Sequence, residues 1–263
     1  MNRSQKVCLR ILGILIVALL LPGYLFPLDG REVMVNVDKR PTGNTSRALV
    51  KMDLVDSKGK VNSRSVEMFT VKDEKDLKKM VVVFHAPASV KDTRYLAIEN
   101  EGRDDDKWIY LPALKRVRRI AASEGGSSFM GSDFTYDDMS ERDVDKDDHK
   151  LLREEPLGQY SCYVIESAAK DPKDSQYSKR ISWIAKDLWV PIKIELYDKR
   201  GSLQKVATLD KIEMLQGFVT PLQTTMKNVQ KNTSTILTME QFVWNEAIPA
   251  GIFTTRFLET GKP

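Results

Sequence analysis

"ALVKMDLVDSKGKVNSRSVEMFTV", residues 48–71, decides the fold class of this chain. Apolar residues at every second position from Ala48 to Leu54 fall on one side of an extended chain, and Lys51 and Asp53 fall on the other. This is the pattern of a β-strand with one buried face. "DSKG" at 56–59 is a turn signal, and the letters SVEMFTV that end the stretch alternate again. The stretch therefore predicts a β-hairpin.

The same alternation recurs along the rest of the chain. Further strands are expected at 79–85, 94–100, 107–111, 115–121, 158–167, 178–186, 191–198, 203–215, 220–230 and 234–245. About a dozen strands with short turns predict a largely antiparallel sheet, because parallel neighbours need crossovers of a dozen or more residues. Short helices are expected at 30–40, 88–93, within 127–142 and at 247–253. Such a large twisted sheet closes or curls around something, so its inner face is a natural cavity.

The first 28 residues have the layout of a secretory signal peptide. Arg3, Lys6 and Arg10 precede an apolar run at 11–21. This run is shorter than the roughly 20 residues that span a bilayer. We expect residues 1–28 to be a signal peptide, with an uncleaved N-terminal anchor as the alternative, and residues 29–263 to form a single domain.

Charge and cysteine content narrow the class of protein. The leader holds three of the 41 basic residues and none of the 37 acidic ones, so the remainder has 38 basic and 37 acidic residues, a net charge of +1. A nucleic-acid-binding domain usually carries a large basic excess, so we predict no nucleic-acid partner. Beyond the leader only Cys162 is left, so the fold must be held by its core instead of by an internal disulfide.

Catalytic and metal-binding motifs are missing from the sequence. His85 and His149 are the only histidines, and the chain has no HExxH, GxSxG, phosphate loop or CxxC. We interpret His85 as a core or edge residue and Cys162 as a small buried hydrophobe. Residues 143–154 have acids at several positions of a calcium loop, but Asp148 stands where the sharp turn requires glycine. We therefore predict no enzyme, no catalytic residue, no cofactor and no metal.

A basic run, "LKRVRRI" at 114–120, has two interpretations. On a strand, Arg116 and Arg118 share one face and Arg119 points to the other. The run is either a solvated edge strand guarded by charge or a patch that meets lipid phosphates or an acidic partner. As a candidate membrane or partner patch it comprises Arg116, Arg118 and Arg119.

The segment "SSFMGSDFTYDDM" at 127–139 fits neither strand nor helix periodicity. It is either a lid across the open side of a curled sheet or a fixed plug that closes the core. As a lid it would contact lipid through five side chains: Phe129, Met130, Phe134, Tyr136 and Met139. Its acids, Asp133, Asp137 and Asp138, would cap helices or pair with the arginines of the basic run. Candidate residues for the cavity wall are Met52, Leu54, Met68, Trp108 and Trp183.

The stretch "WIYLPALKRVRRI" at 108–120, followed by "SSFMGSDFTYDDM", resembles the outer-membrane lipoprotein-sorting protein family, a LolA-like group of the bacterial envelope. The resemblance extends to 183–203 and 244–258. It implies a mainly β fold, in which a large curled antiparallel sheet forms an unclosed half-barrel with a few short helices as a lid, as in LolA and LolB.

The resemblance also implies a function and a location. The expected function is that of a periplasmic carrier or chaperone that binds acyl chains of lipoproteins or lipids for sorting to the outer membrane. Its expected partners are these acyl chains, an inner-membrane lipid-exporting transporter and an outer-membrane acceptor. The alternative is a non-catalytic envelope scaffold whose sheet is filled by its own side chains. The expected location is the periplasm, with membrane association as a further option.

Overall fold

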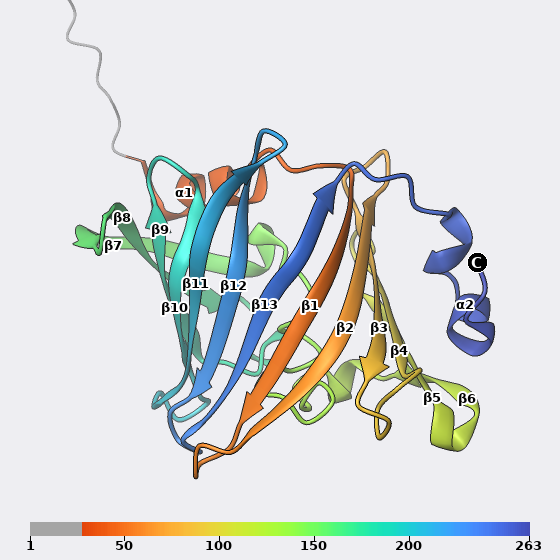
Figure 1. Ribbon diagram of the computed structural model, residues 1–263. Helices are drawn as coiled ribbons and strands as arrows, with labels where there is room; N and C mark the ends of the chain where they lie inside the picture. Colours follow the sequence, from red (N-terminus) through yellow and green to blue (C-terminus); the bar gives the residue numbers. More distant parts are fainter. Residues whose placement is uncertain (1–27) are drawn as a thin grey trace, which may run out of the picture.

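Thirteen strands form one antiparallel sheet in the computed structural model, which describes residues 28–263 (Figure 1). The order across the sheet is β6-β5-β4-β3-β2-β1-β13-β12-β11-β10-β9-β8-β7, so β6 and β7 are its two edges and the sheet is not closed. The predicted unclosed antiparallel sheet is confirmed. The signal-peptide prediction for 1–28 falls almost entirely outside the described residues. Within those residues, no helix is both long and apolar enough to cross a bilayer.

Most strands lie where the alternation predicts them. Their bounds are β1 Thr45–Val55, β2 Val61–Lys72, β3 Lys78–Ala86, β4 Arg94–Ile98, β5 Asp106–Leu111, β6 Arg116–Ile120, β7 Asp147–Leu157, β8 Tyr160–Ala169, β9 Lys179–Ala185, β10 Val190–Tyr197, β11 Leu203–Leu215, β12 Phe218–Asn228 and β13 Thr233–Trp244. The opening hairpin is β1–β2, in which Ala48 lies opposite Met68 and Val50 opposite Val66. These four apolar side chains lie on the concave face of the curled sheet, where Met68 packs against the main core formed by the other three and their neighbours.

Two helices flank the sheet. Helix α1 (Gly30–Asp38) begins with a capping box between Asp29 and Glu32 and buries Val33 against β7 and β8. Helix α2 (Thr255–Thr260) ends at Gly261, which has the positive φ of 67° that favours glycine at a helix end. Together with the 3₁₀ turn η5 (Ala250–Phe253), α2 covers β3, β4 and β5 on the convex face.

Two of the predicted helices are wrong. Residues 87–92 form a hydrogen-bonded turn, and 127–142 form bends and turns with one isolated bridge between Ser128 and Thr135. The expectation of a helix at 247–253 is met only by the short η5. Strand β7 and helix α2 were not predicted at all.

The segment 121–146 connects the two edges of the sheet. It leaves β6 at one edge and enters β7 at the other, with the 3₁₀ turns η2 (Ala122–Glu124) and η3 (Val144–Lys146) near its ends. Between these ends it crosses the concave side, where its aromatic residues join the main core. We call residues 121–146 the strap, because both of its ends are tied to edge strands.

Candidate functional site

The strap covers one part of the concave face with aromatic side chains. Phe129 is fully buried, and its ring lies 5.1 Å from that of Tyr95 and 6.0 Å from that of Phe84. Tyr136 meets Phe129 edge to face at 5.7 Å. Phe134 is buried in the same cluster. The predicted lid residues thus come together here, and contact with lipid stays a prediction for them.

The two predicted lid methionines lie at the border of this cluster. Met130 and Met139 are partly buried and pack against it. Met130 has a positive φ of 52°, and its carbonyl accepts a hydrogen bond from Arg64 of β2 at 2.6 Å. The backbone turn at Met130 and Gly131 explains why this stretch follows no simple period.

Three of the predicted cavity residues lie on the concave face. Met52, Leu54 and Met68 belong to the main core or pack against it, beneath the strap. In the state described, the strap covers them, so the open space lies elsewhere.

The placement of the two tryptophans in the cavity wall is wrong. A row of directly opposed residues across β9, β10, β11, β12, β13 and β1 connects Trp183 with Asp53. Asp53 points to the convex face, because its neighbour Met52 points to the concave one, so Trp183 lies on the convex face as well. There its indole donates to Glu155 at 2.6 Å and Lys193 lies over its ring at 4.1 Å. Trp108 is likewise convex and packs against the cluster of α2. Alternation shows which residues share a face, but it does not say which face is inside.

Polar contacts, in addition to aromatic packing, fasten the strap to the sheet. Asp138 accepts a hydrogen bond from the Tyr177 hydroxyl at 3.0 Å and an ion-pair contact from Lys205 at 3.1 Å. The side chains of Lys205 and Asp138 are only 6% and 9% exposed. Burial raises the pKa of Tyr177 above its ordinary value, and the Asp138 carboxylate raises it further, so the hydroxyl stays a donor at neutral pH.

Two further contacts lie on either side of this pair. Lys107 of β5 contacts Asp137 at 2.7 Å. Asp133 accepts hydrogen bonds from the hydroxyls of Thr233 and Thr235 at 2.6 and 3.0 Å. Asp133, Asp137 and Asp138 therefore bind lysine, tyrosine and threonine side chains of other strands and loops, and the predicted pairing of these three aspartates with the arginines of β6 is wrong.

An open hollow of about 1320 Å³ lies beside the strap-covered region. Its floor is made of apolar side chains from three neighbouring strands: Ile194, Leu196, Ala207 and Met226. Leu196, Ala207 and Met226 belong to the same continuous apolar cluster as the residues under the strap. These floor residues were not predicted as a site, although the alternation of 191–198 places Ile194 and Leu196 on one face.

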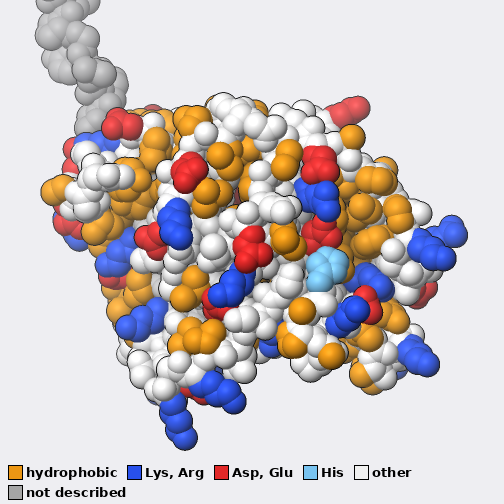
Figure 2. Space-filling model, in the orientation of Figure 1, with side chains coloured by type: hydrophobic (Ala, Val, Ile, Leu, Met, Phe, Trp, Pro, Cys, Tyr) orange, Lys and Arg blue, Asp and Glu red, His pale blue; other side chains and the backbone are white. Residues whose placement is uncertain are grey.

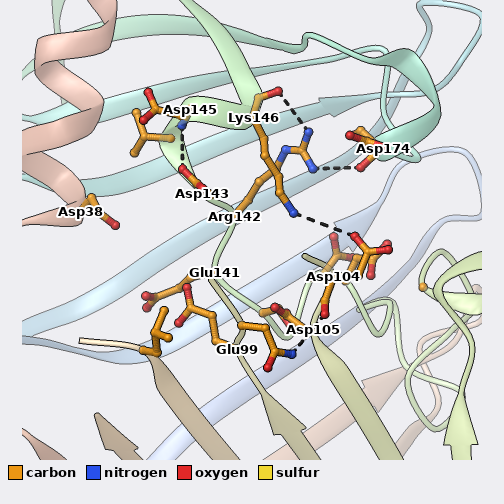
Figure 3. Close-up of a pocket in the computed structure, with 18 of the residues that line it drawn as sticks. Asp38, Glu99, Asp104, Asp105, Glu141, Arg142, Asp143, Asp145, Lys146 and Asp174 are labelled. Atoms are coloured by element: carbon orange, nitrogen blue, oxygen red, sulfur yellow. Dashed lines mark hydrogen bonds and ion pairs between the residues drawn. The ribbon is translucent and has the colours of Figure 1, made fainter. Parts of the chain in front are cut away.

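The mouth of the hollow is charged. Figure 3 shows acidic side chains around the opening, with Asp38 at the end of α1 and Glu99 farther from this helix, together with Glu141, Arg142 and Lys146 of the strap. Lys146 lies 4.0 Å from Asp104 in the turn between β4 and β5. Burial raises the pKa values of Asp38 and Glu99, with further contributions from neighbouring acids. The site therefore combines a small apolar floor with a large wall of polar and charged side chains.

The basic run of β6 does not form a free patch. Arg118 pairs with Glu124 at 2.7 Å, and Arg119 pairs with Asp106. Arg116 is exposed. Two of the three predicted cations are thus committed to carboxylates of the chain itself, and membrane or partner binding by them stays a prediction.

The two histidines and Cys162, which were weighed as catalytic groups, have structural contacts or are buried. His85 contacts Glu67 at 2.9 Å, and His149 contacts Ser167 and the Val144 carbonyl. Cys162 is buried, which raises the pKa of its thiol, and the interpretation as a buried hydrophobe is confirmed. Over residues 28–263, no three His, Cys, Asp or Glu side chains are grouped so that they could hold a metal ion.

Comparison with known proteins gives close matches in fold. A family model described as an uncharacterized protein matches residues 76–260. A crystal structure of a DUF1329 family protein from Desulfovibrio piger has 30% identity and a TM-score of 0.83, covering 87% of this chain and 97% of that one. A domain from Vibrio parahaemolyticus described as an outer membrane lipoprotein-sorting protein has 29% identity and a TM-score of 0.83, covering 88% and 98%.

A more distant structure shares the fold. A LolA superfamily protein from Nitrosomonas europaea has 18% identity and a TM-score of 0.69, covering 88% of this chain and 100% of that one. No curated protein matches the sequence at a significant level. The fold is LolA-like, as the sequence resemblance implies.

Proposed function

This chain belongs to the DUF1329 family, and from that premise and the geometry of the hollow we propose that it is a periplasmic carrier that binds acyl chains of lipoproteins or lipids. The observation that carries the proposal is the hollow of about 1320 Å³ with an apolar floor on β10, β11 and β12. Pockets for small ligands commonly measure about 300–1,000 Å³, so this space is large enough for a hydrocarbon chain.

The apolar floor supplies the binding energy in this proposal. Each buried CH₂ group contributes about 0.8 kcal/mol, so a long acyl chain that leaves water gains on the order of 10 kcal/mol. The polar head of the lipid, or the protein part of a lipoprotein, would stay in the charged mouth beside Glu99 and Arg142. No catalytic step is needed for this role.

The strap is the movable part in this proposal. The apolar cluster is continuous from the floor residues Ala207 and Met226 to Met52 beneath the strap. Lifting the strap would therefore lengthen the apolar surface available to a chain. The contacts of Asp133, Asp137 and Asp138 hold the strap down, so opening costs free energy that is subtracted from binding and favours release.

A second candidate function is that of a non-catalytic envelope scaffold. The specific observation that favours it is the full burial of Phe129, which fills the concave face over β3 and β4 with the protein's own aromatic side chains. The carrier remains our proposal because the hollow beside this cluster is open. An inner-membrane transporter and an outer-membrane acceptor are the partners that a carrier of this kind requires.

Uptake of a fluorescent fatty acid separates the two functions. Ala207 is 5% exposed and points toward the hollow, so Ala207→Trp is expected to fill the floor and lower affinity at least tenfold. Thr208, the next residue, points to the convex face, and Thr208→Trp is the matched control with unchanged affinity. Native mass spectrometry of protein prepared without detergent should show bound lipid. A lipid-free mass together with no uptake by the wild type would favour the scaffold.

A further inference from the structure

Three hairpin turns lie side by side at one end of the sheet. They are the turns at 56–60, between β1 and β2, at 198–202, between β10 and β11, and at 229–232, between β12 and β13 (Figure 1, lower left). Asn232 donates to the Ser57 carbonyl at 3.4 Å, and Gln230 donates to Asp198 at 2.9 Å. These contacts join the turns into one surface, which we call the basic rim.

The basic rim carries an excess of free cations. Its turns contain five: Lys58, Lys60, Lys199, Arg200 and Lys231, and Lys227 lies next to them near the end of β12. All six are exposed, and none of them is within 4.0 Å of a carboxylate among residues 28–263. Figure 2 shows Lys and Arg side chains projecting at this corner.

The two acids of the rim are occupied by the turns themselves. The Asp56 carboxylate accepts hydrogen bonds from the backbone N–H groups of Lys58 and Lys60. The Asp198 carboxylate accepts from the backbone N–H groups of Arg200 and Ser202. These carboxylates are turned toward their own backbone, so the six cations have no carboxylate partner among residues 28–263, and only Lys199 contacts a backbone carbonyl, that of Pro172.

The opposite end of the sheet has the reverse charge. The turns at 73–77 and 99–106 contain eight acidic and two basic residues. They lie at the other end of β2 and β4, and most of their residues line the mouth of the hollow. The basic rim and these two turns, which we call the acidic end, therefore lie at opposite ends of β2, and such a separation of charge orients a protein in an external field although its net charge is small.

Apolar side chains accompany the cations. Val61, directly after the first turn, is 50% exposed, and Val229, in the third turn, is 37% exposed. Lysines can bind a surface whose outer layer is anionic, and exposed valines among them can contact an apolar layer directly beneath it. A charged lipid headgroup region has this order of layers.

From these observations we propose that the basic rim docks on the surface of a bilayer that contains anionic phospholipid. Each Lys or Arg held near an anionic membrane surface contributes about 1 kcal/mol, so five or six act together with appreciable strength. The acidic end is repelled by the same surface, so the protein meets the bilayer with the rim first. The proposal does not depend on which cargo, if any, the hollow takes.

The rim is also connected to the wall of the hollow. Lys199 donates to the Pro172 carbonyl, and the segment that follows, 173–177, lines the hollow. Docking through the rim therefore brings this wall of the hollow close to the membrane surface.

Vesicle flotation tests the proposal with the described chain. Vesicles of phosphatidylcholine with about one-third phosphatidylglycerol should bind the protein at low salt, and raising the salt to 0.5 M should release it because surface charges are screened. Pure phosphatidylcholine vesicles should bind much less. The triple variant Lys58→Gln, Lys60→Gln, Lys231→Gln should lose on the order of 100-fold in partitioning, since each cation contributes about fivefold.

A charge-matched control shows whether position matters. Lys150→Gln, Lys211→Gln, Lys262→Gln removes three exposed lysines outside the rim. This variant should partition within about threefold of the wild type. Equal losses in both triple variants, equal binding to neutral vesicles, or no binding to anionic vesicles at low salt would each overturn the proposal. Binding to an acidic protein but not to vesicles would also overturn it.

Discussion

Among residues 28–263, the pair of Lys205 and Asp138 is the ion pair between the strap and the sheet in which both side chains are most deeply buried. A cation and a carboxylate that are both more than nine-tenths buried lose their hydration, and each depends on the other. Tyr177 gives Asp138 a second contact. A lysine on an antiparallel strand is expected at the surface, so the sequence alone could not identify this contact.

Removing one partner of this pair should destabilise the protein strongly. Asp138→Asn leaves Lys205 buried without a countercharge, and we expect a loss of about 3–5 kcal/mol in the free energy of unfolding. Urea denaturation measures it. Adding Lys205→Met should recover most of the loss. The control is Glu154→Gln, since the Glu154 side chain is 54% exposed where it pairs with Lys186. The interpretation is wrong if Asp138→Asn costs no more than this control.

Asp106 links the acidic end of the sheet to two arginines. Its carboxylate, 14% exposed, accepts from Arg103 at 2.6 Å and also pairs with Arg119. The hydrogen bond from Arg103 and the pairing with Arg119 lower the pKa of Asp106 from 3.8 to about 2, against the opposing effect of burial. A lowered pKa means that the stabilisation is present above pH 4 and is lost as the pH falls toward 2.

Asp106→Asn should therefore matter at neutral pH and not in acid. We expect a loss on the order of 1 kcal/mol at pH 7, a small value because Arg103 and Arg119 are more than half exposed and their charges are screened by solvent. At pH 2 variant and wild type should have nearly equal stability. Urea titrations at pH 7, 4 and 2 measure this, with the exposed Asp104→Asn as control. A difference that stayed constant with pH would contradict the assignment.

At the scale of elements, the alternation of apolar residues predicted every strand except β7, at one edge of the sheet. The strands from β1 to β5 and from β8 to β13 have an apolar residue at most second positions, because at least one face of each is buried. Strand β7 is an edge strand with mostly exposed or half-buried side chains, so 147–157 resembles a solvated loop. The prediction of a helix within the strap was wrong because the conformation of the strap is set by contacts with strands that are distant in sequence.

The candidate site was predictable in its parts and not in its arrangement. Phe129 and Phe134 were singled out because their spacing fits no regular element, and they do lie across the concave face. The prediction that Trp108 and Trp183 face the cavity was wrong, because a strand with apolar residues on both sides does not show which side faces the concave interior. The rim was missed because its cations are brought together by three turns that are distant in sequence.

Helix α2 should stabilise the convex side of the sheet. Leu258 is fully buried in the cluster that contains Trp108, and its carbonyl accepts from Arg94 at 2.9 Å. Leu258→Ala is expected to cost about 2–5 kcal/mol in the free energy of unfolding, since it leaves a cavity in a packed cluster. Thermal or urea denaturation measures the cost. The exposed neighbour Glu259→Ala is the control, and equal effects of the two changes would contradict this role of α2.

At the scale of the whole molecule, the sheet consists of two meanders. Strands β1–β6 and β7–β13 each pair in sequence order, and β1 pairs with β13 between them. The strap joins the same two meanders at their outer edges. The curl of the sheet is therefore held on one side by backbone hydrogen bonds and on the other by side-chain contacts, which are the easier of the two to break and re-form.

The pairing of β1 with β13 has a consequence for biosynthesis. About 180 residues separate the end of β1 from the start of β13. At a ribosomal rate of about 5–20 residues per second, roughly 10 to 35 seconds pass between the synthesis of β1 and that of its partner strand β13. During that interval the first meander presents a long bare strand edge, which other chains can join. Nascent copies of this protein therefore depend on being kept apart, or kept unfolded, until the last strand has emerged.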